Sequence, residues 1–194
     1  MAPAAWSIPV ISLACGWQPG SVRFDDMHPT SPPEFPLNIP EIFIVSPSIR
    51  EAILIHLLDS TPNEGVGLVS STSSEDGSVI EALQFYPGGN VAASPTRFAM
   101  DPRDVLGAVR DIRKSGHDLG AIVHSHLFGP PTPSEIDLAE AHYPDALMVI
   151  VSFARQPAEM RAWHVARTDE QTIVTNVRIE SEYRGALVRS SDQR

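Results

Sequence analysis

The stretch HSHLFGPPTPSEID, residues 124–137, carries the pattern that decides how the chain is interpreted. Its first half ends an apolar run with two histidines two residues apart, and residues i and i+2 of a strand point to the same face. Its second half opens a helix with Ser134 and Asp137, which are three residues apart and share a face. A loop rich in glycine and proline separates the halves. If this loop turns the chain back, Asp137 lies beside His124 and His126.

Two imidazoles and one carboxylate are a donor set for an open zinc site, because catalytic zinc usually has three protein ligands and one open position. Zinc lowers the pKa of its bound water, and hydrolysis also needs a base to take the proton. Glu64 is the candidate base, since it opens the apolar run NEGVGLV, where a carboxylate gains nothing from core packing. Ser134 is the candidate hydrogen-bond donor to the oxyanion that forms when water attacks a carbonyl.

The spacing of these residues resembles the JAMM (MPN-plus) zinc metalloprotease family. It runs Glu64, then His124 and His126 around one serine, seven residues, Ser134, two residues, and Asp137. The resemblance covers roughly residues 41–180. The segment GPPTPSEIDLAEAHYPDALMVIVSF is similar to the prokaryotic branch, which includes peptidases of ubiquitin-like and sulfur-carrier proteins.

This resemblance implies an α/β fold in which helices flank a curved mixed sheet, similar to the cytidine deaminase fold. It implies one Zn²⁺ per chain, bound by His124, His126 and Asp137, with Glu64 as acid/base and Ser134 supporting the oxyanion. Members cleave peptide or isopeptide bonds after the C-terminal Gly-Gly of ubiquitin-like proteins, and some bacterial members release cysteine from a sulfur carrier. We therefore expect a zinc metallopeptidase of the isopeptidase type with such a protein as its substrate.

Other interpretations stay open at this point. The alternative function is that of a non-catalytic MPN-type scaffold or interaction subunit, although such subunits usually lack the metal ligands that this sequence keeps. Ser134 can cap a helix, with or without a role in catalysis. Asp137 can favour the helix dipole, and Glu64 can be an exposed carboxylate at a strand start. A zinc deaminase of the related fold is excluded, because it needs a Cys-x-x-Cys pair and Cys15 is the one cysteine present.

Periodicity and turn residues predict one mixed α/β domain from residue 39 to residue 188. Helices are expected where capping residues precede apolar residues at helical spacing, and strands where short apolar or alternating runs lie between turns. The helices are expected over 46–60, capped by Ser46 or Ser48, over 101–116, and over 133–143. The strands are expected over 41–46, 63–71, 78–88, 97–101, 118–126, 146–153, 159–166 and 171–180.

The two ends of the chain have a different character. Residues 1–38 are rich in proline and show no clean periodicity, so we expect a partly disordered arm there. Met27 is an alternative start within this arm. Residues 189–194 are expected to be a frayed tail.

Composition narrows the function classes. A net charge of −10 disfavours nucleic acid as a partner, and no polybasic segment indicates binding to anionic membranes. No run of 18 apolar residues predicts a membrane-spanning helix. The N-terminal segment lacks the basic residues of a signal peptide, so we expect a cytoplasmic protein. Its oligomeric state and the identity of its substrate stay open.

Overall fold

The computed structural model describes residues 39–168 and 171–182. The predicted arm at 1–38, with Cys15 and Met27, and the predicted tail at 189–194 lie outside the described residues. No helix within the described ranges is long and apolar enough to span a membrane. The elements are β1 (Ile42–Ile44), α1 (Pro47–Asp59), β2 (Val66–Ser73), β3 (Val79–Gly88), α2 (Pro102–Lys114), β4 (Asp118–His126), α3 (Glu135–Glu140), β5 (Leu147–Ser152), β6 (Glu159–Arg167) and β7 (Thr172–Glu180).

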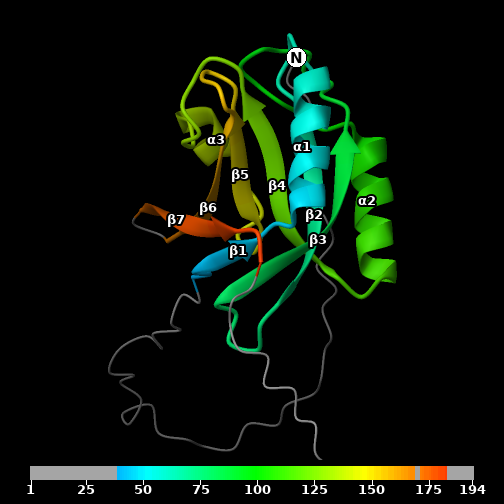
Figure 1. The fold of residues 1–194 in the computed structure, drawn as a ribbon, viewed down its shortest axis with the longest axis vertical. Helices are drawn as coiled ribbons and strands as arrows, with labels where there is room; N and C mark the ends of the chain where they lie inside the picture. The colour runs from blue at the N-terminus through cyan, green and yellow to red at the C-terminus, as the bar shows by residue number, and fades with distance from the viewer. Residues whose placement is uncertain (1–38, 169–170, 183–194) are drawn as a thin grey trace, which may run out of the picture. The chain divides into compact units, whose positions relative to one another are not determined.

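The strands form one curved, mixed sheet in the order β1-β3-β2-β4-β5-β6-β7 (Figure 1). The pairs β2–β3, β2–β4, β5–β6 and β6–β7 are antiparallel, and β4–β5 is parallel. The three-residue strand β1 pairs in parallel with both β3 and β7, so the hydrogen-bonded ladder closes on itself. The predicted fold class, a curved mixed sheet flanked by helices, is confirmed.

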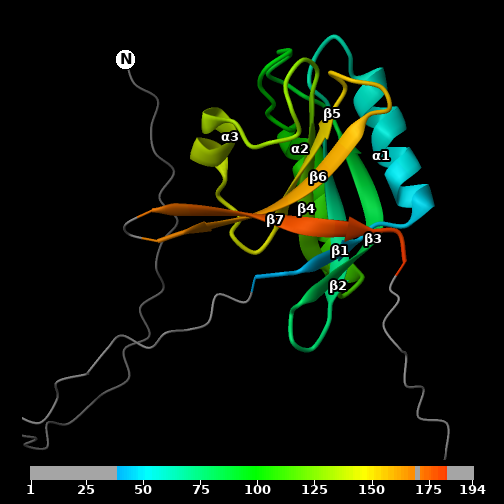
Figure 2. The ribbon, with the colours of Figure 1, turned by 60° about the vertical axis from the view of Figure 1, so that its left-hand side comes forward.

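The two faces of the sheet are covered by different helices, as Figures 1 and 2 show for α1 and α2. Ile53 and Leu57 of α1 belong to the main hydrophobic core, together with Val123 of β4. On the opposite face, Ile122 and His124 of β4 line a cavity that α2 also borders. The alternation along β4 therefore places the predicted histidines on the α2 face and the main core on the α1 face.

Local signals determine where the first two helices begin. The Ser46 hydroxyl accepts a hydrogen bond from the Ile49 amide, so Ser46 rather than Ser48 caps α1. Asp101 caps α2 in the same way.

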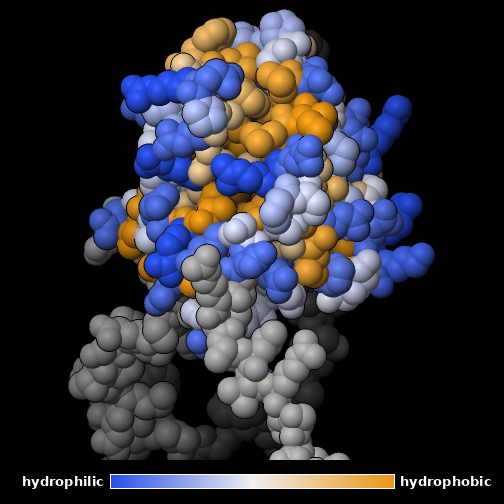
Figure 3. Space-filling model, viewed as in Figure 1, coloured by the Kyte–Doolittle hydropathy of each residue, from blue (hydrophilic) through white to orange (hydrophobic). Residues whose placement is uncertain are grey.

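Some apolar side chains lie at the surface. Leu58 of α1 is 54% exposed, although its helical spacing predicts a core position. Hydrophobic residues also gather in patches among hydrophilic ones on the face drawn in Figure 3.

Two predicted elements are wrong in extent or type. Residues 97–101 are not a strand; they form a loop that, among residues 39–168 and 171–182, makes one ladder contact, an isolated bridge between Asn90 and Met100. The apolar side chains of this segment pack toward the candidate site instead of into the sheet. The helix predicted over 133–143 ends at Glu140, and the proline at 144 disfavours helical backbone just before it.

Candidate metal centre

The histidine pair lies at the C-terminal end of β4, where the two rings share a face as the strand period predicts. The Nε2 atoms of His124 and His126 are 3.2 Å apart. His124 is completely buried, whereas His126 is partly accessible. The side-chain Nδ1 of His126 is 2.8 Å from the Pro130 carbonyl and can donate to it, so Nε2 is the ring atom turned toward His124 and Asp137.

Asp137 reaches both histidines because the loop after β4 turns the chain back into α3. One carboxylate oxygen lies 3.3 Å from Nε2 of His124, and the other lies 3.3 Å from Nε2 of His126. The carboxylate is almost completely buried. The sequence-based expectation that these three side chains meet therefore agrees with the structure, which groups them as residues able to hold a metal ion.

The donor set fits zinc. Tetrahedral ligands at zinc–nitrogen distances of about 2.0–2.1 Å are separated from one another by about 3.3 Å. The 3.2 Å and 3.3 Å separations among His124, His126 and Asp137 agree with that spacing, although the two contacts to Asp137 involve different oxygens. Neutral imidazole and carboxylate are also ligands that zinc accepts.

Ser134 is the N-cap of α3 and is bonded to Asp137. Its hydroxyl donates to a carboxylate oxygen of Asp137 at 2.7 Å, and its amide donates to the same oxygen at 2.7 Å. In return the Ser134 hydroxyl accepts from the Asp137 amide at 3.2 Å. This reciprocal capping box holds the Asp137 side chain over the first turn of the helix. The capping interpretation of Ser134 is therefore correct, and Asp137 is fixed by more than the helix dipole.

Glu64 lies near this group although it precedes it by 60 residues. The pairing of β2 with β4 sets Val66 opposite His124, so the start of β2 meets the end of β4. Glu64 is only 5% exposed, which rules out an exposed strand-start carboxylate. Burial raises the pKa of Glu64 from 4.5 to about 7, an effect that the charge on His126 opposes and the charge on Asp137 reinforces.

Electrostatics favour a negative Asp137 between the two rings. Burial alone would raise the pKa of Asp137, but the hydrogen bonds from His124 and His126 outweigh it and hold the pKa well below its usual range. Burial lowers the pKa of His124, and Asp137 opposes this only in part. Burial would also lower the pKa of His126, yet the bonds to Asp137 and Pro130 raise it above the ordinary value. The site thus has one fixed negative charge and a neutral buried His124.

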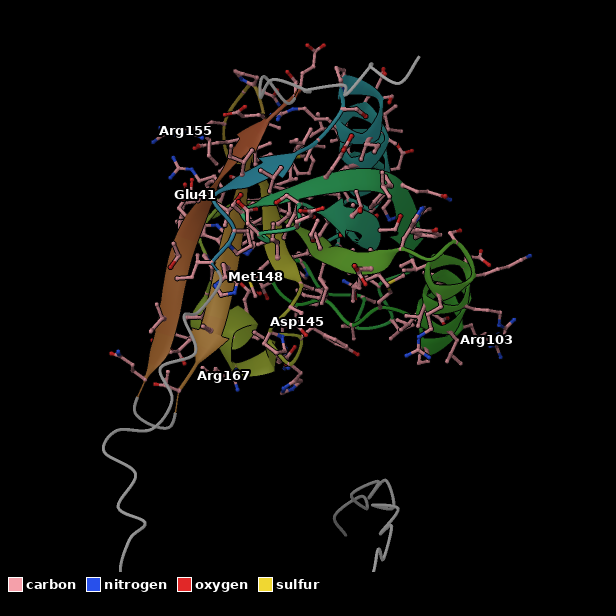
Figure 4. The ribbon with its side chains drawn as sticks, turned by 90° about the horizontal axis from the view of Figure 1, so that it is seen from below. Glu41, Arg103, Asp145, Met148, Arg155 and Arg167 are labelled. Carbon is pink, nitrogen blue, oxygen red and sulfur yellow. The ribbon has the colours of Figure 1, made fainter. Side chains whose placement is uncertain are left out.

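Contacts from other elements hold the segment that carries Asp137. The guanidinium of Arg167, at the end of β6, donates to the carbonyls of Leu138 and Ala139 and so satisfies the C-terminal end of α3. Figure 4 shows Arg167 beside this helix. The indole Nε1 of Trp163 donates to the Pro131 carbonyl at 2.9 Å, which fixes the loop before α3.

A cavity of about 490 Å³ borders the metal-ligand group. His124 and Asp137 form part of its wall, and most of the remaining wall is apolar, with Val105 and Val109 of α2 and Ile122 of β4. Met148 also lines this cavity and is labelled in Figure 4. The donor group therefore lies at the edge of a largely apolar hollow, where fixed charges act more strongly than in water.

Sequence reasoning missed three residues that shape the site. The buried Ser125 hydroxyl accepts a hydrogen bond from the Gly65 amide at 2.8 Å and so joins the histidine strand to the glutamate segment. Phe98 stacks on His124 with ring centroids 4.4 Å apart. Trp163 is half-buried, and its indole is bonded to the loop before α3. Ser125 lies inside the recognised motif, so its position was a signal; nothing local indicated Phe98 or Trp163.

The fold and the site together define a class: a curved mixed sheet flanked by helices, with a His-His-Asp group able to hold a metal ion where β4 and α3 meet. Residues 46–166, more than half of the chain, match the family described as prokaryotic homologs of the JAB domain, and the chain belongs to this family. The predicted resemblance to the prokaryotic branch of the JAMM family is thereby confirmed.

Three relatives are similar to this chain in sequence. The probable TtuB-protein conjugate cleaving protease of Thermus thermophilus is 35% identical over 103 residues, which are 53% of this chain and 65% of that protein. Desampylase of Pyrococcus furiosus is 30% identical over 46% of this chain and 59% of its own length. The match thus spans less than two thirds of either relative. The CysO-cysteine peptidase of Mycobacterium tuberculosis is 25% identical over 64% of this chain and 83% of its own length.

Solved structures agree with the fold. The solution structure of protein DSY2949 from Desulfitobacterium hafniense matches 74% of this chain and 95% of its own, with 28% identity and a TM-score of 0.61. The solution structure of a protein from Salinibacter ruber matches 71% of this chain and 91% of its own, with 26% identity and a TM-score of 0.53.

Proposed function

We propose that the chain is a zinc-dependent peptidase that hydrolyses a peptide or isopeptide bond after the C-terminal Gly-Gly of a ubiquitin-like or sulfur-carrier protein. The names of two relatives support this proposal, since one is a probable TtuB-protein conjugate cleaving protease and the other a CysO-cysteine peptidase. The observation that carries the proposal is the buried Glu64 beside a His-His-Asp group of zinc-like spacing. The cytoplasm is the proposed compartment.

Three side chains would hold the metal: His124, His126 and Asp137. Bound there, one zinc ion per chain would supply an acidified water and a Lewis acid for the scissile carbonyl. The protonation of two of these ligands favours metal binding. The pKa of His124 is lowered and that of Asp137 is held below its usual range, so both can donate electron pairs without first losing a proton. His126, whose pKa is raised, has to release the proton on Nε2 when the metal binds.

Glu64 is proposed as the group that moves the proton. A general base works best when its pKa is close to the working pH, and burial raises the pKa of Glu64 to about 7. Its carboxylate would take a proton from the attacking water and then donate that proton to the departing amine. The amine of a lysine side chain and that of a cysteine adduct require the same transfer.

Ser134 is proposed to support the oxyanion as well as to cap α3. The residue is exposed, so its hydroxyl can be reached from the substrate side. Its proton is engaged by Asp137 at 2.7 Å, so the oxyanion role requires the hydroxyl to turn from the carboxylate to the substrate. A donor of this kind contributes about 3–4 kcal/mol to transition-state stabilisation in other hydrolases.

The proposal is tested with the full chain and its Glu64→Gln variant. Zinc per chain is measured, and each protein is given a ubiquitin-like protein whose terminal Gly-Gly is joined to cysteine or to a lysine side chain. We expect about one zinc in both proteins and cleavage only by the wild type. Glu75→Gln, an exposed glutamate in the β2–β3 turn, is the matched control and should cleave normally.

Other outcomes would contradict the proposal at different points. A wild-type chain that binds no zinc would favour the non-catalytic scaffold. A zinc-bearing chain that cleaves neither adduct would refute the substrate class. Equal cleavage by wild type and Glu64→Gln would refute the role of Glu64. Cleavage of only one adduct would decide between cysteine release and isopeptide hydrolysis.

A further inference from the structure

The loop between β3 and α2 is organised by a single side-chain amide, that of Asn90. Its Nδ2 donates to the Glu64 carbonyl at 2.8 Å and to the Arg97 carbonyl at 2.9 Å. Its Oδ1 accepts from the amides of Ala92 at 3.0 Å and Ala99 at 2.9 Å. Three of these four bonds close the loop on itself. The fourth leaves the loop and holds the main chain of the proposed acid/base residue.

The backbone around Glu64 is held from two sides. Its amide donates to the Ser94 carbonyl at 2.9 Å, which adds a second bond to the Asn90 loop. The next amide, that of Gly65, donates to the buried Ser125 hydroxyl of the histidine strand. Glu64 therefore connects the loop with β4 through hydrogen bonds on both of its neighbouring peptide units.

The same loop also reaches the metal ligands. The ring of Phe98 stacks on His124 at a centroid distance of 4.4 Å and an interplanar angle of 25°. The guanidinium of Arg97 forms an ion pair with Glu140 at 2.9 Å, on the helix that carries Asp137. By fixing this loop, Asn90 can keep Glu64 at a constant position relative to the metal ligands on β4 and α3.

Only an amide side chain of this length can make all four bonds. Asparagine offers two N–H donors and an oxygen with two lone pairs, and Asn90 uses both ends. Aspartate has the same shape but no donor, so it would keep the bonds to Ala92 and Ala99 and lose those to Glu64 and Arg97. The Asn90→Asp variant therefore removes the link to Glu64 with little change in volume.

We infer that Asn90 is a positioning residue for Glu64: it sets the place of the acid/base carboxylate relative to the metal ligands without touching substrate. The inference rests on the proposed function for the role of Glu64. Its structural half, the restraint of the Glu64 main chain by Asn90, stands on the hydrogen bonds alone.

The kinetic test compares Asn90→Asp with wild type on the Gly-Gly-cysteine adduct. We expect kcat to fall about 10- to 100-fold, the range seen when a supporting residue of a metal site is removed. KM and zinc content should stay unchanged. Asn176→Asp is the matched control, because the Asn176 amide also donates to a main-chain carbonyl, that of Ala162, but far along the sheet on β7. It should keep wild-type kcat.

Two further measurements separate positioning from a general loss of structure. If Asn90 acts through Glu64, Asn90→Asp should add little further loss in a Glu64→Asp background, in which the shortened carboxylate is already displaced but can still take a proton. Hydrogen exchange of the metal-free protein should be faster in Asn90→Asp at the amide of Glu64, because the loop that accepts its hydrogen bond through the Ser94 carbonyl is no longer tied to the Glu64 main chain, and it should be unchanged in β5 and β6. The exchange experiment needs no substrate, so it stays informative if the proposed function fails.

The outcomes are distinct. Unchanged exchange at Glu64 in Asn90→Asp would overturn the inference, and so would unchanged kcat in a variant that binds zinc. If Asn90→Asp does not fold, exchange in the wild type decides: the amides of Glu64 and Ala99 should open together with the same protection, and unequal protection would overturn the coupling. Failure of the wild type to cleave any adduct would count against the proposed function alone.

Discussion

The carboxyl of Glu64 is half protonated near pH 7, because burial raises its pKa from 4.5 to about 7. This shift is also a statement about stability. A raised native pKa means that protonation favours the folded state. The contribution is fully present below the unfolded pKa of about 4.5 and is lost as pH rises through about 7.

The first prediction concerns Glu64→Gln in the metal-free protein. Glutamine keeps the neutral shape at every pH, so the variant avoids the cost of a buried charge. Its free energy of unfolding, relative to wild type, should be about 2 kcal/mol higher at pH 8.5 than at pH 5. Denaturant unfolding at the two pH values measures this, with Glu75→Gln as control. An equal difference at both pH values would show that Glu64 is not buried as a carboxylic acid.

The second prediction separates the capping role of Ser134 from its role in orienting the Asp137 carboxylate. Ser134→Ala removes the cap of α3 and the hydroxyl that orients Asp137, so stability should fall by about 1 kcal/mol and zinc affinity about tenfold. Ser46→Ala removes the cap of α1, which is far from the ligands in sequence and bonds only the cap region. It should lower stability similarly and leave zinc affinity unchanged. Titration with zinc and thermal unfolding measure both; equal zinc affinity in the two variants would contradict the role of Ser134.

At the scale of elements, α1 and the start of β2 meet at a glycine. A Cβ on Gly65 would lie 2.9 Å from the Leu57 Cα of α1 and 2.9 Å from the Ser60 hydroxyl. Backbone cannot move away as a side-chain tip can, so the helix and the strand would have to separate. Glu64 is the residue immediately before Gly65, so this packing also affects the site.

The third prediction is that Gly65→Ala destabilises the protein by about 1–3 kcal/mol and reduces cleavage more than zinc binding. Gly107 is the matched control: it lies inside α2 and a Cβ there meets nothing within 4 Å. Gly107→Ala should stabilise the protein by about 0.5–1 kcal/mol, because alanine loses less entropy in a helix. Stability measurements and activity assays on both variants provide the test, and a neutral Gly65→Ala would contradict this packing.

At the scale of the whole molecule, the candidate metal centre brings together the end of β4 and the first turn of α3, which one loop connects in the chain. His124 and His126 end β4, and Asp137 begins α3. A ligand that binds only the folded arrangement stabilises it by mass action.

The fourth prediction is that free zinc at a hundred times its dissociation constant stabilises the chain by about 2.7 kcal/mol, which raises Tm by about 5–10 °C. A chelator should reverse the change. Asp137→Asn should respond much less, because an amide oxygen replaces the ionised ligand. Thermal scans with and without zinc measure the effect, and an identical response of the two proteins would exclude Asp137 as a ligand.

The fifth prediction concerns the proposed domain at 39–188. All described strands and helices lie between residues 42 and 180, so removal of residues 1–38 takes away none of them. The truncated chain should unfold cooperatively at a Tm close to that of the full chain. A drop of many degrees would show that the N-terminal segment is part of the folded unit.

The local features of the fold and of the candidate site were determined by the sequence itself, because short-range geometry depends on neighbouring residues. The strand period puts His124 and His126 on one face, and the capping residues Ser46, Asp101 and Ser134 start their helices. The family resemblance added the expectation of a curved mixed sheet. These features need only the backbone angles and hydrogen bonds of a few neighbouring residues.

The remaining features were decided by the tertiary structure, because they join segments far apart in the chain. The register of β2 against β4 brings Glu64 to the histidines, and burial there sets its pKa. Residues 97–101 resemble a strand locally, yet Phe98 stacks on the ring of His124, and within the described part of the chain the segment pairs through a single isolated bridge. In the sequence, Asn90 looks like an ordinary turn residue. The folded structure brings its amide to the carbonyl of Glu64, because strand register and long-range hydrogen bonds depend on the whole fold.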